Sequence, residues 1–187
     1  TASGQGAVVI GLDAAFSISD PAGNAQTTAG GADRTVTFDS VAPTVTLEQA
    51  AGQVDPAKNA SIQFTLSSSE ALDGTTIAAS DFTVTNGSAV TITGSGSTWT
   101  LATTASANGA VTIAPAAGFS VSDTAGNAKT TAGGTDRTVT YDSVAPTLTL
   151  QQAAGQADPT NGSSIQFTLS SSEALDGTTI AASDFTV

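Results

Sequence analysis

Residues 61–70 read Ser-Ile-Gln-Phe-Thr-Leu-Ser-Ser-Ser-Glu, and this stretch indicates the fold class. Ile62, Phe64 and Leu66 alternate with polar residues, which places the three apolar side chains on one face of an extended chain. Such alternation is typical of a β-strand with one buried and one solvated face. Similar short segments, separated by turns rich in Gly, Asn, Asp and Ser, predict seven strands around residues 44–48, 62–66, 82–84, 90–92, 99–101, 111–113 and 139–141.

The same stretch belongs to an internal repeat. Ser61–Val84 recurs letter for letter at Ser164–Val187, an offset of 103 residues, and the offset holds without a gap along the chain. A unit of this size is a domain rather than a solenoid repeat. The predicted divisions are the C-terminal part of one repeat, one complete repeat and the N-terminal part of a third, at residues 1–40, 41–143 and 144–187. We therefore expect the chain to be a slice of a longer tandem array.

Seven short strands in about 100 residues, with the single Trp near the middle of the unit, predict an all-β chain of immunoglobulin-like β-sandwich domains in tandem. Trp99 alternates with Leu101, so it is expected to pack in the core. A short helical turn is expected around residues 75–79.

The composition narrows the functions that are compatible with the chain. It carries 4 Lys and Arg against 16 Asp and Glu, a net charge of −12, and it has no His or Cys. Few phosphates could be neutralised, which argues against nucleic-acid binding. No apolar run approaches the roughly 18 residues of a membrane-spanning helix, so no membrane insertion is expected. A Ser-His-Asp triad and a typical zinc site are excluded, and we expect no enzyme, whereas hard cations with oxygen ligands remain compatible.

The acidic residues gather at the expected domain junctions. In a sandwich of the usual strand order, alternate loops meet at one end of the domain. The residues expected at that end of the complete repeat, with the linker residue first, are Asp39, Glu70, Asp73, Asp123, Asn127 and Asp136. The residues expected at the next junction are Asp55, Asp142, Glu173 and Asp176.

Crowded carboxylates repel one another unless a cation neutralises them, and Ca²⁺ takes six to eight oxygen ligands of this kind. Structural calcium at the junctions is therefore one interpretation. The alternative is that these residues only cap turns, because Asp, Asn and Glu favour such positions. Asp123-Thr124-Ala125-Gly126-Asn127, which repeats Asp20-Pro21-Ala22-Gly23-Asn24, is compatible with both interpretations.

Three elements of the sequence carry a family resemblance: the linker Asp39-Ser40-Val41-Ala42-Pro43-Thr44, Ser69-Glu70 followed by Ser80-Asp81-Phe82-Thr83-Val84-Thr85, and Asp123-Thr124-Ala125-Gly126-Asn127. Together they resemble the bacterial Ig-like repeats of giant secreted adhesins of the RTX and Bap types. The resemblance implies an extracellular or cell-surface stalk in bacterial adhesion or biofilm formation. In several such arrays calcium stiffens the junctions, which implies ligands among Asp39, Glu70, Asp73, Asp123, Asp136 and Asp142.

The expected function is thus a structural extender whose partners are the neighbouring repeats of the same chain. An alternative is the subunit of a self-assembling extracellular filament, sheath or matrix polymer. The two partial repeats motivate this alternative, because open half-sandwiches have unpaired edges that could accept strands from another chain.

Overall fold

The computed structural model describes residues 2 and 4–187 of the chain, and its regular structure is β-strand with short 3₁₀ turns. The all-β prediction is therefore confirmed. The chain divides into two compact units, the first ending at Asp142 and the second running from Ser143 to Val187. The first unit contains the complete repeat and the partial repeat that precedes it.

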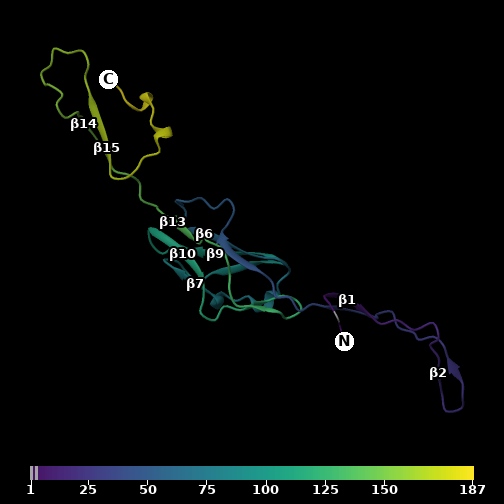
Figure 1. Ribbon diagram of the computed structural model, residues 1–187. Coiled ribbons are helices and arrows are strands. Elements are labelled where there is room, and N and C mark those ends of the chain that lie inside the picture. Colours follow the sequence, from purple (N-terminus) through teal and green to yellow (C-terminus); the bar gives the residue numbers. More distant parts are fainter. Residues whose placement is uncertain (1, 3) are drawn as a thin grey trace. The chain divides into compact units, whose positions relative to one another are not determined.

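The complete repeat consists of two main sheets, in which all seven predicted strands are present. Strands of both sheets are labelled in Figure 1. The four-stranded sheet has the order β5-β6-β9-β8, and the three-stranded sheet has the order β13-β10-β7. All pairings within the two sheets are antiparallel. The strands are β5 (Val45–Gln49), β6 (Ser61–Ser68), β7 (Phe82–Thr85), β8 (Thr91–Ser95), β9 (Thr98–Thr104), β10 (Gly109–Pro115) and β13 (Thr138–Tyr141).

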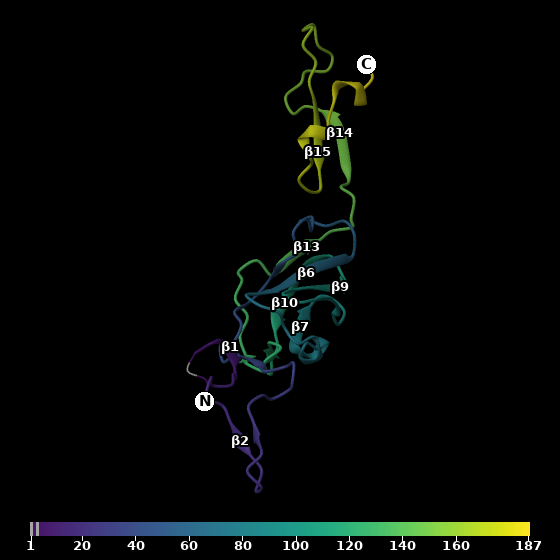
Figure 2. The same ribbon diagram turned by 90° about the vertical axis from the view of Figure 1, so that its right-hand side faces the viewer.

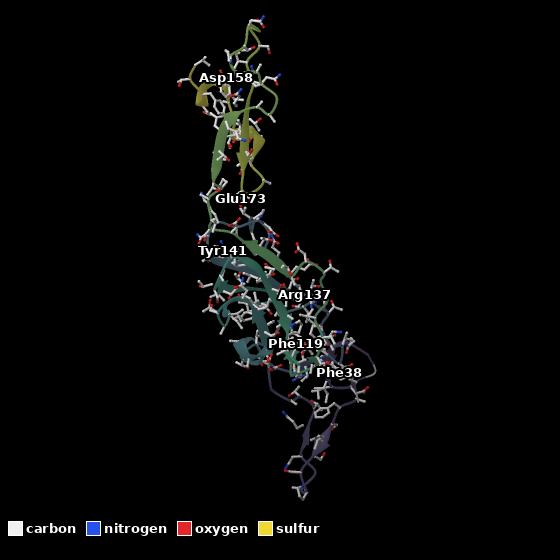
Figure 3. All side chains as sticks on the ribbon, turned by 90° about the vertical axis from the view of Figure 1, so that its left-hand side faces the viewer. Phe38, Phe119, Arg137, Tyr141, Asp158 and Glu173 are labelled. Atoms are coloured by element: carbon white, nitrogen blue, oxygen red, sulfur yellow. The ribbon has the colours of Figure 1, made fainter. Side chains whose placement is uncertain are left out.

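The core of this repeat follows directly from the alternation in the sequence. Along β6 the apolar residues are buried and most residues between them are not, as expected for a strand with one face in the core. Both sheets contribute to the core. Phe82 packs edge-on against Phe119, which is labelled in Figure 3, with ring centroids 5.8 Å apart. Trp99, which the sequence predicts in the core, is half-buried and packs against the core from outside it, so this prediction is confirmed only in part. Side chains with no exposed surface come from both sheets: Leu47, Ile62, Phe64, Leu66, Leu101, Val111, Ile113 and Val139.

The loops between the strands contain short elements that the sequence predicts only in part. The helical turn expected at 75–79 is present as two 3₁₀ turns, η1 (Gly74–Thr76) and η2 (Ala79–Asp81). A small hairpin of β11 (Val121–Ser122) and β12 (Ala128–Lys129) lies in the long connection between β10 and β13. Among the described residues, no helix is long and apolar enough to cross a membrane.

The partial repeats form the same strand pairs as their counterparts in the complete repeat. In the N-terminal segment β1 pairs with β4 as β10 pairs with β13, and in the second unit β14 pairs with β15 as β5 pairs with β6 (Figure 2). Most of their large apolar side chains are exposed, because the segment itself does not contain the sheet that covers their counterparts in the complete repeat. The elements are β1 (Gly6–Val9), β2 (Ile18–Ser19), β3 (Ala25–Gln26), β4 (Thr35–Phe38), β14 (Leu148–Gln152), β15 (Phe167–Ser171), η3 (Gly177–Thr179) and η4 (Ala182–Asp184).

The repeat offers a matched pair of substitutions that tests this account of the core. Phe64 has no exposed surface, whereas its counterpart Phe167 lies in an identical local sequence and is 65% exposed. Phe64→Ala should lower the free energy of unfolding by about 3–5 kcal/mol, since it leaves a cavity. Phe167→Ala should change it by less than about 0.5 kcal/mol. Urea unfolding followed by the fluorescence of Trp99, the single Trp of the chain, measures the complete repeat alone. Equal shifts for the two variants would contradict the account.

Candidate metal centre

Among the residues that the structure describes, one group of three carboxylates comes together: Asp39, Glu70 and Asp123. One ligand atom from each lies within 4.8 Å of the others. Asp39 follows β4, Glu70 follows β6 and Asp123 follows β11, so three segments that are distant in sequence supply the group. Asp123 is 2% exposed, and the other two residues are half-buried.

Hydrogen bonds to the main chain hold the connections beside this group in place. Leu72 forms an isolated antiparallel bridge with Asp123, and the Asp73 amide donates to the Ser122 carbonyl at 2.8 Å. Ser69 is tied to Thr44 in both directions, because its amide donates to the Thr44 carbonyl and its hydroxyl accepts from the Thr44 amide. The residues around Glu70 are therefore anchored both to the linker and to the connection that carries Asp123.

Asp123 organises the turn in which it lies. Its Oδ1 accepts from the amides of Ala125 at 2.8 Å and Asn127 at 2.9 Å, and its Oδ2 accepts from the side-chain amide of Asn127 at 2.9 Å. Gly126 has a φ of 93°, a conformation that favours glycine. This geometry confirms the turn-capping interpretation of Asp123, and it also fixes the carboxylate beside Asp39 and Glu70.

Asn127 connects the turn to the linker. Its Nδ2 donates to the main-chain oxygen of Asp39 at 3.3 Å, across 88 residues of sequence. The sequence singled out Asn127 as a ligand candidate, but it did not predict this contact. In the structure Asn127 positions the two aspartates with its side-chain nitrogen.

The pKa values of Glu70 and Asp123 are shifted in opposite directions, and the causes differ. Burial raises the pKa of Glu70 from its ordinary value of 4.5, and the neighbouring Asp39 and Asp123 raise it further. Burial also acts to raise the pKa of Asp123, but hydrogen bonds from Asn127, Ala125 and Gly126 outweigh this effect and lower it. Asp123 therefore stays ionised at neutral pH, and its charge opposes the ionisation of Glu70.

The residues of this group fit a hard divalent cation. Three carboxylates supply several of the six to eight oxygen ligands that Ca²⁺ requires, and a cation would relieve the repulsion that raises the pKa of Glu70. Basic side chains are scarce in the chain, and both arginines donate to main-chain carbonyls: Arg137 to Leu47 and Arg34 to Ala29. Asp39, Glu70 and Asp123 are the residues that would hold the ion.

The other predicted metal ligands of the complete repeat, Asp73 and Asp136, lie outside this group. Asp73 caps η1, where its carboxylate accepts from the amide and the hydroxyl of Thr75. These hydrogen bonds lower the pKa of Asp73. Asp136 is exposed and its carbonyl accepts from the Gln49 amide at the far end of β5, so it does not join the group.

The metal ligands predicted for the next junction are divided between the two units. Asp55 accepts from the Thr140 amide at 2.9 Å, and the Asp142 amide donates to the Ala57 carbonyl, so the first unit holds both residues near the end of β13. In the second unit Asp176 caps η3 as Asp73 caps η1, and Glu173 is exposed.

No family model, no curated protein and no solved structure matches the chain. The internal repeat provides a comparison instead. Asp20 makes the same three hydrogen bonds to Ala22 and Asn24 that Asp123 makes to its own turn. Asp20 is exposed, whereas Asp123 is buried beside two further carboxylates.

The raised pKa of Glu70 predicts how stability depends on pH without a cation. Above its ordinary value of 4.5, Glu70 loses its proton in the unfolded chain before it does in the folded chain. The free energy of unfolding should therefore fall as pH rises through the raised pKa. Glu70→Gln should remove this loss and raise the urea midpoint of the Trp99 transition at pH 7 in excess chelator.

The matched control is Glu173→Gln, the same change at the exposed counterpart in the second unit. It should leave the Trp99 transition unchanged. A Glu70→Gln variant with the same pH profile as the parent chain would show that the three carboxylates do not interact in solution.

Proposed function

We propose that the chain is part of a structural stalk of tandem immunoglobulin-like repeats, rigidified by calcium where one repeat joins the next. The observation that carries this proposal is the position of Asp39. Asp39 directly follows β4, the last strand of one repeat, and its carboxylate lies beside Glu70 and Asp123 of the following repeat. A cation held by these three residues would tie consecutive repeats together.

The strand order supports an immunoglobulin-like sandwich. The order β5-β6-β9-β8 corresponds to strands A-B-E-D, and β13-β10-β7 corresponds to G-F-C, which is the arrangement of the seven-stranded immunoglobulin domain. The core is shared between these two sheets. In this arrangement the linker enters at the end of the domain where the connections after β6 and β11 lie.

Calcium would restrict the movement of the linker relative to the loops of the following repeat. Without calcium the three carboxylates repel one another. The electrostatic free energy therefore falls when the linker moves away from the loops. With it, the linker carboxylate and the two loop carboxylates share ligation of one ion, which favours a single geometry of the junction. A cation that binds only the assembled site stabilises that state by mass action.

The net charge favours an extended arrangement of the repeats. A chain with a net charge of −12 repels its neighbours and stays soluble. The resemblance to bacterial adhesin repeats favours a location at the cell surface, with adhesion or biofilm formation as the biological setting. The proposed role of the chain is mechanical and not catalytic.

Calcium should raise the Tm of the complete repeat. Extracellular calcium modules bind with a Kd of about 10⁻⁴–10⁻³ M, so about 10 mM calcium should add roughly 1.4–2.7 kcal/mol to the free energy of unfolding. For a domain of about 100 residues this shift exceeds about 5 °C in Tm. Thermal unfolding of the full chain, followed by Trp99 fluorescence with calcium and then with excess chelator, measures it.

Asp39→Asn should abolish most of this shift, because it removes the linker charge while keeping an oxygen that can accept the hydrogen bonds from Gln5 and Val41. Glu173→Gln, outside the group, should keep the full shift. No calcium-dependent shift in the parent chain, or an equal shift in Asp39→Asn, would refute calcium at this junction.

A further inference from the structure

The complete repeat contains a long stretch without charge. Residues 82–122 have no Asp, Glu, Lys or Arg, although the chain carries 16 acidic and 4 basic residues elsewhere. The strands β7, β8, β9 and β10 all lie within this stretch. Two copies of a chain with a net charge of −12 repel one another over most of their surface. The uncharged strands are therefore the part of the repeat where two copies can approach with the least electrostatic repulsion.

Two of the sheet edges of the complete repeat are covered by its own loops. Along β5, the Gly133 amide donates to the Val45 carbonyl at 2.7 Å, and its carbonyl accepts from the Leu47 amide at 3.0 Å. Along β13, the Ala57 amide donates to the Thr140 carbonyl at 2.8 Å. Proteins commonly cover an edge strand in this way, because its unpaired main-chain groups would otherwise pair with another chain.

The outer edge of β8 has no such cover. β8 is the last strand of the four-stranded sheet, and no segment among the described residues pairs with its outer side. Alternate N–H and C=O groups of an edge strand point away from the sheet. The sequence of β8, Thr-Ile-Thr-Gly-Ser, also lacks the Lys, Pro or charged side chains that commonly prevent pairing at an edge. The edge strand of the other sheet, β7, begins directly after Asp81, so two copies that paired there would each bring a carboxylate to the contact.

We propose that two copies of the chain associate side by side through β8, with the two strands antiparallel and related by a two-fold axis. The partner is a second copy, because its β8 is equally uncharged and uncovered, and because a two-fold contact makes one edge complementary to itself. The axis lies at Thr93, the middle residue of β8, so that all five residues of the strand are paired. Thr93 then faces its own counterpart, and Thr91 faces Ser95.

The side chains of β8 suit this pairing. Thr91, Thr93 and Ser95 are exposed and lie on one face of the sheet, since side chains alternate along a strand. Thr93 already lies opposite Thr100 of β9 in the same way, and such Thr pairs across strands stabilise a sheet. The pairing would join the two four-stranded sheets into one continuous sheet whose new contact is formed by hydroxyl side chains and main-chain hydrogen bonds.

A single pair of β8 strands is a small contact. The strand has five residues, whereas a standard interface involves about 20–30 residues a side, so we expect a Kd on the order of 1 mM for one repeat. In the tandem array proposed above, two stalks would repeat the contact at successive units, and multivalency would raise the overall affinity. Only this multivalent step rests on the proposed function. The pairing itself involves neither the linker nor the grouped carboxylates, so it is tested without calcium.

Disulfide trapping with the thiol oxidant diamide detects so weak a contact, because the chain has no cysteine and each variant carries one thiol. Facing residues of antiparallel strands have Cα atoms about 4.5–5.5 Å apart, which a disulfide can span. In excess chelator and about 0.15 M NaCl, Thr93→Cys should form a covalent dimer at least about tenfold faster than Thr98→Cys. Thr98 is the matched control, since it is exposed on the neighbouring β9 and lies in the same uncharged stretch. The two β9 strands would lie three strand spacings apart, about 14 Å, which is too far for a disulfide.

The register of the two strands gives the decisive result. Thr91→Cys and Ser95→Cys should each couple no faster than Thr98→Cys when alone, because identical positions away from the axis lie about 13 Å apart. Their mixture should form a one-to-one dimer at the rate of Thr93→Cys. An unchanged Trp99 unfolding transition in each variant verifies that the complete repeat is folded. Equal rates at all four positions, or a mixture that couples no faster than its components, would overturn the proposal.

Discussion

The buried carboxylate of Asp123 connects the parts of the complete repeat that define its junction. Its hydrogen bonds to Ala125 and Asn127 close the turn between β11 and β12, and Asn127 then reaches the linker at Asp39. The backbone around Asp123 also bridges to Leu72, next to the segment that carries Glu70. The turn-capping and cation-site interpretations are therefore compatible, because the hydrogen bonds that cap the turn also hold the carboxylate in the group.

The repeat shows how far local sequence determines structure. Ser61–Val84 and Ser164–Val187 are identical in sequence, and both form two 3₁₀ turns at the same positions, the first of which is capped by an aspartate. They differ in burial, since only the first segment has the second sheet packed against it. Alternation and turn chemistry are local properties that an isolated half retains, whereas the core requires both halves.

The same distinction explains what the sequence could predict. The positions of the seven strands could be predicted from the alternation of apolar and polar residues. The grouping of Asp39, Glu70 and Asp123 could be predicted from the rule that alternate loops meet at one end of a sandwich. Asp136 does not obey this rule, because the chain before it runs alongside β5, where the Leu47 amide donates to the Gly133 carbonyl at 3.0 Å. Gly134 allows the loop to approach β5 closely, because a Cβ at this position would clash with the Leu47 carbonyl oxygen and its φ of 103° favours glycine. Neither this path nor the contact of Asn127 with Asp39 has a signal in local sequence, since each joins residues almost 90 positions apart.

The most direct test of the central claim compares the two copies of the turn within one molecule. In ¹H–¹⁵N spectra of the full chain titrated with calcium, the amides of Ala125, Gly126 and Asn127 should shift and saturate. Those of Ala22, Gly23 and Asn24 should not, because Asp20 has the same turn but is not among the grouped carboxylates. Equal shifts at both turns, or none at either, would contradict a cation site formed where the linker meets the complete repeat.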